Sequence, residues 1–359
     1  VTASCDQAML ATYWGNTDFG EKKDLGPPWE LQYSEDRGYF AIATRDFAAG
    51  ELICTERPTT HTAGWHPFSD DQIRALNEGV ASLSEEQQRA FFEMSNVFPE
   101  CDPAAGIYMT NSFDMACEDD EASAGGCGMY LAIARLNHSC CPNAQQTHLP
   151  ETKEEVLYAT RAIRRGEELC DCYIELRQST ADRQRELEKW YKFTCACSAC
   201  RGLSAQHTVQ PLMETVFAST TASAATTSKT ESASFRSDAD KSDANRVAAL
   251  RLEQRMMQLA EEGQVQSALE TALQIIQVLE DPLSAGWGER YLADTYLYVL
   301  HFSCSLFREG YDQRKWRAMA EKHAQQAYAM NMKLQGPLSP DTRRSLDYVQ
   351  KLDKMLRGD

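Results

Sequence analysis

The feature that most constrains this chain is a run of three closely spaced cysteines, Cys195, Cys197 and Cys200. This spacing is typical of metal ligation and fits a disulfide framework poorly. A structural zinc ion takes four ligands in a tetrahedron, so the fourth must come from another segment. Cys140 and the adjacent Cys141 are the candidates; we favour Cys140, although the sequence alone separates the two poorly. A metal joining these segments would fold the chain after residue 190 back over the polar residues around Cys140, which indicates a built active site rather than an isolated zinc finger.

The composition narrows the classes of partner and compartment. The formal net charge of −17 disfavours a nucleic-acid backbone as the main partner, because that contact needs clustered lysines and arginines. The same charge suits a basic peptide, or simply keeps the chain soluble.

No apolar run approaches the ~20 residues that span a bilayer, so no membrane partner is expected. The first residues show no signal peptide, although the chain does not begin with Met. Thirteen cysteines, an odd number, fit a reducing compartment. We therefore expect an intracellular monomer, in the nucleus, the cytoplasm or both.

The N-terminal half alternates short strand and helix patterns. Residues 38–57 are predicted to form a hairpin, because two strand-like runs flank an Ala-Ala-Gly turn. Residues 69–97 are predicted to form two helices, each opened by a capping box. An acidic, glycine-rich loop is expected over residues 117–128. The remaining predicted elements are strands over 156–163 and 168–174 and a helix over 180–191.

The C-terminal part has a different pattern. Residues 217–244 are rich in Ser, Thr, Ala, Asp and Lys and contain almost no large apolar residues, which predicts a flexible linker that cannot offset its ordering entropy. From about Arg246 the apolar residues recur with a helical period, and Ser339-Pro340 marks a helix start. Roughly four to six helices with short connections predict a stack of helix pairs, similar to tetratricopeptide repeats.

Three further strings carry polar chemistry. Residues 137–143 read Asn-His-Ser-Cys-Cys-Pro-Asn, residues 166–173 read Gly-Glu-Glu-Leu-Cys-Asp-Cys-Tyr, and Gly38 precedes a strand pattern. Taken alone, each fits a bland structure: a satisfied His–Asn pair, a turn before a half-buried strand, and a plain turn. The seven-residue string at 137–143 is nevertheless specific as a unit.

In this order the strings resemble the SET-domain protein methyltransferases, and most closely the SMYD-like subclass. That family carries Asn-His-Ser-Cys-x-Pro-Asn, Gly-Glu-Glu-Leu-x-x-x-Tyr and a Cys-x-Cys-x-x-Cys run after the domain. The resemblance implies an α+β fold built from small sheets with a pseudoknot-like core. The implied parts are an N-terminal segment 1–29, a SET domain 30–176 with a helical insert at about 66–128, a zinc-binding post-SET segment 177–203, a flexible linker 204–245 and an all-helical domain 246–359.

The chain departs from the subclass at two places. No cysteine lies between Pro58 and Ser69, where the subclass usually carries a MYND zinc finger. Phe40 stands where the family often has the second glycine of a Gly-x-Gly loop. This second departure motivates an alternative, in which the chain is a SET-like scaffold that binds S-adenosylmethionine or a peptide without methylating protein. Methyl transfer to a small molecule on the same scaffold is a further alternative.

The resemblance also implies the site. It implies a protein-lysine methyltransferase acting on a histone or non-histone protein, with S-adenosylmethionine and Zn²⁺ as cofactors. Tyr173 would be the catalytic tyrosine, and Tyr191 the second aromatic of the lysine channel. The cofactor would be bound by Gly38, Tyr39, Asn111, Asn137, His138 and Phe193. The zinc ligands would be Cys140, Cys195, Cys197 and Cys200.

Overall fold

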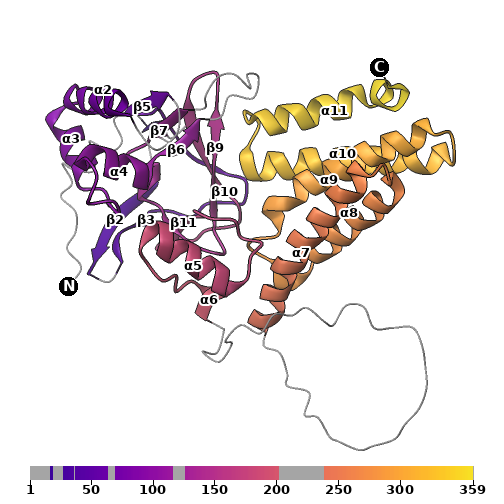
Figure 1. Ribbon diagram of the computed structural model, residues 1–359, viewed down its shortest axis with the longest axis horizontal. Helices are drawn as coiled ribbons and strands as arrows, with labels where there is room; N and C mark the ends of the chain where they lie inside the picture. Colours follow the sequence, from indigo (N-terminus) through magenta and orange to yellow (C-terminus); the bar gives the residue numbers. More distant parts are fainter. Residues whose placement is uncertain are drawn as a thin grey trace, which may run out of the picture.

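The computed structural model describes residues 17–18, 27–35, 37–63, 69–115, 126–201 and 238–358. Figure 1 shows the strands and the helices up to α6 on one side, with helices α7 to α11 beside them. The strands are β1 (Thr17–Asp18), β2 (Trp29–Ser34), β3 (Gly38–Ala43), β4 (Leu52–Glu56), β5 (Thr60–Ala63), β6 (Phe113–Met115), β7 (Gly126–Met129), β8 (Asn137–His138), β9 (Ala144–Leu149), β10 (Glu154–Ala159) and β11 (Glu168–Asp171). The helices are α2 (Asp70–Ala81), α3 (Glu85–Phe92), α4 (Pro103–Asn111), η3 (Ile133–Arg135), α5 (Thr180–Tyr191), α6 (Ser198–Arg201), α7 (Asp238–Glu261), α8 (Val265–Leu279), η4 (Pro282–Ser284), α9 (Glu289–Arg308), α10 (Gln313–Gln335) and α11 (Pro340–Arg357).

The described strands form three small sheets. Their orders are β1-β4-β10-β9, β2-β3-β11-β8 and β5-β7-β6. Most neighbours are antiparallel, but β8 and β11 pair in parallel, with Asn137 opposite Cys170 and His138 opposite Asp171. This parallel pair brings the two polar strings of the sequence into direct contact.

The predicted hairpin over residues 38–57 is wrong. Strand β3 pairs with β2 and β11, whereas β4 pairs with β1 and β10 in a different sheet. Between them, Phe47 exchanges both backbone hydrogen bonds with Ile163, at 2.8 and 2.9 Å, and this bridge takes the chain from one sheet to the other. The alternating pattern identified the strands but not their partners, because pairing depends on distant segments.

The insert begins with the two predicted helices. Both capping boxes are present, formed by Ser69 with Gln72 and by Ser84 with Gln87. A third helix, α4, was not predicted; the side chain of Asp102 caps its first backbone N–H groups. Of the acidic loop predicted over 117–128, only residues 126–128 are described, and they belong to β7.

The C-terminal helices α7 to α11 pack in sequence, each against the next. Helix α7 begins at Asp238, so residues 238–245, for which the composition predicts a linker, are helical. Acidic residues in its first turn favour the helix by facing the positive end of the helix dipole. The rest of the predicted linker, residues 204–237, lies outside the described residues.

Two large apolar cores hold the molecule together. The first lies within the sheets and the insert. The second joins Cys140 and the segment 172–200 to buried residues of α7, α8 and α9, including Ala249 and Met256, and to Trp287 just before α9. The segment that carries the sequence motifs is therefore packed against the helical domain as well as the sheets.

Candidate functional site

The two polar strings meet at the parallel pair of β8 and β11. The Ser139 backbone N–H donates to the Asp171 carbonyl at 2.9 Å. The buried side chain of Asn143 accepts from the Cys170 N–H and donates to the Glu168 carbonyl, both at 2.8 Å. Because the Asn143 side chain satisfies two backbone groups of the second string, it fixes how the first string lies against the second.

Tyr173 follows β11 and turns its hydroxyl back towards the first string. The hydroxyl donates to the Leu136 carbonyl at 2.5 Å, and the Tyr173 N–H donates to His138 Nδ1 at 3.0 Å. Burial, followed by the carboxylate of Asp171, raises the pKa of Tyr173 well above its usual value. The phenol therefore stays neutral and acts as a hydrogen-bond donor.

Tyr173 belongs to a group of four rings. Its ring centroid lies 4.9 Å from that of Tyr191 and 5.4 Å from that of His138, and the His138 ring lies 6.2 Å from Phe193. Helix α5 ends at Tyr191, and the next residue, Lys192, adopts the left-handed conformation with φ of 59°; this turn directs the chain after Tyr191 back towards His138. The four predicted aromatic or imidazole side chains thus form one cluster.

The cysteines also converge. The Sγ atoms of Cys140, Cys195, Cys197 and Cys200 all lie within 4.8 Å of one another, and those of Cys140 and Cys200 are 3.6 Å apart. Zn–S bonds of about 2.3 Å in a tetrahedron put sulfurs about 3.8 Å apart, so the set fits a structural zinc ion. Cys141 is not in this group; it packs beside Gly286 instead.

Cys140 has polar partners both inside and outside the group. Hydrogen bonds from the neighbouring thiols, that of Cys195 first, hold the pKa of Cys140 far below its ordinary value. His138 Nε2 and Arg183 Nε each lie 3.3 Å from its sulfur. Since His138 Nδ1 accepts from Tyr173, the ring proton is on Nε2 and points to the sulfur.

The first strand reaches the same site through its backbone. The Asn137 side chain donates to the Tyr39 carbonyl at 3.0 Å and lies 3.3 Å from Glu168 Oε1. Gly38 adopts φ of 70°, a conformation that side chains disfavour, and opens the strand beside Tyr39. The predicted first loop and the Asn-His pair are therefore adjacent.

Asn111 is placed differently. It is the last residue of α4, and its side-chain nitrogen donates to the carbonyls of Ser95 and Ile107, both at 2.7 Å. Within the described ranges, no hydrogen bond or ring contact links Asn111 to Asn137 or His138. The structure does not bring this predicted residue into the cluster.

Side chains of the helical domain enter the site, and the sequence motifs did not indicate them. Arg290 of α9 lies 3.6 Å from the buried carboxylate of Asp171. The Tyr291 hydroxyl donates to Glu175 at 2.6 Å and accepts from the Leu176 N–H at 3.1 Å. The string Gly-Trp-Gly-Glu-Arg-Tyr at 286–291, with aromatic and charged residues at a glycine-flanked helix start, was the available signal.

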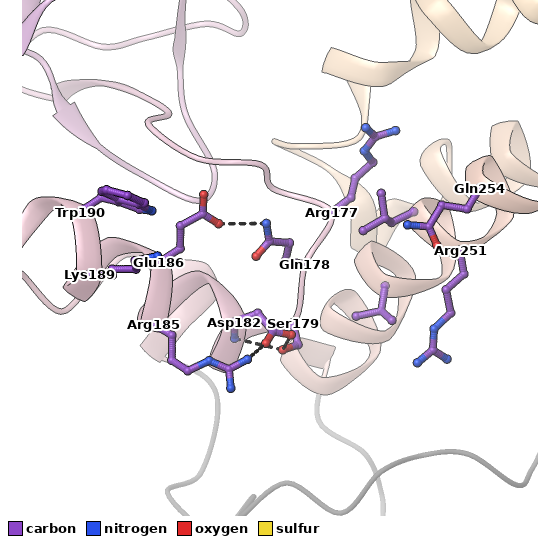
Figure 2. Close-up of a pocket in the computed structure, with 12 residues that line it drawn as sticks. Arg177, Gln178, Ser179, Asp182, Arg185, Glu186, Lys189, Trp190, Arg251 and Gln254 are labelled. Atoms are coloured by element: carbon purple, nitrogen blue, oxygen red, sulfur yellow. Dashed lines mark hydrogen bonds and ion pairs between the residues drawn. The ribbon is translucent and has the colours of Figure 1, made fainter. Parts of the chain in front are cut away.

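A surface cavity of about 640 Å³ lies between α5 and α7, next to the segment that carries Tyr191 (Figure 2). Trp190, which is 48% exposed, forms one wall and precedes Tyr191. The charged lining side chains are Arg177, Arg185, Lys189 and Arg251 with Asp182 and Glu186. Basic groups outnumber acidic ones here, so this cavity gives no support to the expectation of a basic peptide.

Residues 38–174 match the family model of the SET domain. The chain carries a SET domain. The α+β fold and the SMYD-like resemblance predicted from the motifs are confirmed by this match and by the relatives below.

The chain is similar to lysine methyltransferases over part of its length. It is 30% identical to histone-lysine N-methyltransferase set5 of Schizosaccharomyces pombe over 166 residues, 46% of this chain and 48% of that protein. It is 34% identical to human N-lysine methyltransferase SMYD2 over 111 residues, 31% of this chain and 25% of that protein. The chain thus spans about half of the first relative and a quarter of the second.

A solved structure, the SET domain of LSMT bound to lysine and AdoHcy, overlaps 97% of this chain and 93% of that one. The two chains share 12% identity, with a TM-score of 0.31. Among the described residues, none of the helices is long and apolar enough to cross a membrane.

Proposed function

We propose that this chain is an S-adenosylmethionine-dependent protein-lysine methyltransferase. The observation that supports this best is the single cluster of Tyr173, Tyr191, His138 and Phe193 within a matched SET domain. When bound, S-adenosylmethionine supplies a methyl group on a sulfonium that is already a good electrophile. What remains for the protein is to position two reactants, which contributes up to about 7–11 kcal/mol in well-oriented systems.

The cofactor is proposed to lie between the first strand and the Asn-His pair. Gly38 and Tyr39 offer backbone groups there, and Asn137 joins them through its hydrogen bond to the Tyr39 carbonyl. Phe193, whose ring lies 6.2 Å from that of His138, would supply a stacking surface for the adenine. The role of Asn111 stays a prediction from the resemblance, because its side-chain nitrogen already donates within the insert.

The acceptor lysine must enter as a neutral amine, because an ammonium ion has no lone pair to attack the methyl group. An apolar channel lined by Tyr173 and Tyr191 would lower the lysine pKa by disfavouring the charged form. The neutral Tyr173 hydroxyl, held on the Leu136 carbonyl, orients the amine and does not remove its proton. The cysteine cluster is proposed to bind Zn²⁺ and to hold the segment that carries Tyr191 and Phe193.

Histone and non-histone proteins are both open as substrates. The net charge of −17 is the one support for a basic peptide. If charge attraction matters, peptide binding should weaken between low and high salt. An intracellular site, nuclear or cytoplasmic, is proposed from the many free thiols, which a reducing compartment preserves.

The scaffold alternative has one structural observation in its favour. Phe40 replaces a glycine that the family often carries, and the Arg37 guanidinium lies 4.5 Å from the centroid of its ring. Phe40 therefore places a cation-contacting ring near the first loop, where the family places its cofactor. Methyl transfer by the purified chain decides between the two readings.

The test has two stages. Titration calorimetry first measures S-adenosylmethionine binding to the wild type and to Tyr173→Phe. Mass spectrometry then reads labelled methyl transfer from the same cofactor to the proteins of a cell extract. We expect equal cofactor affinity, with transfer to lysine by the wild type alone. Transfer by Tyr173→Phe at the wild-type rate would refute the role of Tyr173, and binding without transfer by the wild type would favour the scaffold.

A further inference from the structure

Arg246 of helix α7 reaches from the helical domain to the cysteine cluster. The side chain is fully buried. Nη2 donates to the Cys140 carbonyl at 2.8 Å, and Nη1 donates to the Leu176 carbonyl at 2.9 Å. The guanidinium also lies 4.6 Å from the centroid of the buried Trp287 ring. One side chain thus fixes the backbone of a cluster cysteine and of the segment after Tyr173.

Arg246 is a buried cation with no carboxylate in direct contact among the described residues. A buried cation without a counter-charge is costly, because the protein interior replaces its hydration poorly.

The cysteine cluster can supply the missing negative charge. Four thiolates around a divalent zinc ion carry a net charge of about −2. Two buried guanidinium groups lie beside it, since Arg183 Nε is 3.3 Å from the Cys140 sulfur and Arg246 contacts the Cys140 carbonyl. Asp243, one turn before Arg246, partly offsets Arg183 at 3.1 Å and caps α5 by accepting from the Thr180 N–H at 2.7 Å.

We propose that Arg246 is a positioning residue of the metal site, so that the helical domain completes the cluster by orienting Cys140 and compensating the thiolate charge. This rests on the proposed zinc site. Partners that orient metal ligands typically change metal affinity about 10–100-fold when removed. It follows that metal binding and the docking of α7 stabilise each other, since such coupling is reciprocal.

The experiment uses the full chain with its zinc. Zinc content is measured by elemental analysis, and the rate of zinc release to a chromogenic chelator is compared among variants. Arg246→Met should release zinc at least about tenfold faster than the wild type, and Arg246→Lys, which keeps the charge but loses one carbonyl contact, should be intermediate. Arg343→Met is the matched control, because Arg343 joins the two domains through an exposed ion pair with Glu151. It should release zinc at the wild-type rate.

A second measurement does not depend on variant folding. In the wild type, zinc removal should increase hydrogen exchange in residues 240–250 of α7 and leave residues 342–352 of α11 unchanged. A folded Arg246→Met with wild-type zinc release, or unchanged exchange in α7 after zinc removal, overturns the proposal, as does a wild type that binds no zinc. The methylation assay is separate, so a chain that holds zinc but transfers no methyl group refutes only the proposed function.

Discussion

Glu155 of β10 is a buried carboxylate that should make the stability of the protein depend on pH. Its carboxylate is almost fully buried; Oε1 is 3.1 Å from His148 Nδ1, and Oε2 has no hydrogen-bond partner among the described residues. Burial raises the pKa of Glu155 from 4.5 to about 7. Its cross-strand neighbour Glu56 is also buried, and burial raises the pKa of Glu56 to about 8.

The direction follows from proton linkage. Between pH 4.5 and about 7, folded Glu155 keeps a proton that the unfolded chain releases, so the free energy of unfolding falls as pH rises. At about 1.36 kcal/mol per pH unit, the free energy of unfolding is lower than at acidic pH by about 1 kcal/mol at pH 5.5 and by about 3 kcal/mol at pH 8.5. Glu155→Gln cannot ionise, so relative to the wild type it should gain about 2 kcal/mol over this interval. The substitution also removes the Glu155 charge that helps to raise the pKa of Glu56, and this change adds to the gain in the same direction.

Urea denaturation at pH 5.5 and pH 8.5 measures this change. The matched control is Glu154→Gln, because Glu154 is the neighbouring carboxylate of the same strand and forms an ion pair with the exposed Arg57 at 2.8 Å. The control should leave the difference between the two pH values as in the wild type. If Glu155→Gln shows the same stability change at both pH values, the buried carboxylate does not titrate in this range and the reasoning fails.

Two further predictions concern packing and cofactor binding. A Cβ at Gly336 would lie 2.0 Å from the Tyr158 ring at φ of 73°, so Gly336→Ala should cost at least about 2 kcal/mol more than Gly310→Ala, where φ is 84° and nothing lies within 4 Å. Urea denaturation measures both variants, and equal costs would contradict the contact. Phe193→Ala should weaken S-adenosylmethionine binding about tenfold by calorimetry, because a stacking surface is lost. Phe92→Ala, at an exposed aromatic of the insert, is its control, and unchanged affinity of Phe193→Ala would contradict the stacking role.

Local signals in the sequence predicted local structure well. The capping residues Ser69 and Ser84 act within three residues of themselves, and both helices begin where those residues predict. The cysteine spacing predicted three members of one cluster for the same reason, because a short segment can hold them together. The sequence favours Cys140 over Cys141 on weaker grounds, and the structure places the Cys140 sulfur, not that of Cys141, among the other thiols.

Contacts between distant segments were beyond the sequence patterns. Nothing in the periodicity of α7 distinguishes a buried Arg246 from a solvent-exposed arginine, because both occupy ordinary helix positions. The same holds for Arg290, whose partner Asp171 lies more than a hundred residues earlier. Both arginines belong to the site only because the helical domain packs against the segment that carries the motifs.

The proposed zinc site and the proposed cofactor site are built from the same two short segments, 138–140 and 193–195, so their coupling can be tested. Cys140 follows His138 by two residues, and Cys195 follows Phe193 by two residues, so the cluster holds both sides of the His138–Phe193 ring pair. Cys197→Ser, which removes one thiol without touching either ring, should therefore lose zinc and weaken S-adenosylmethionine binding together. Calorimetry on the metal-depleted wild type should give the same weakened affinity. If cofactor affinity survives complete zinc removal, the cluster only fastens the chain locally, and the ring pair is held by the packing of the helical domain alone.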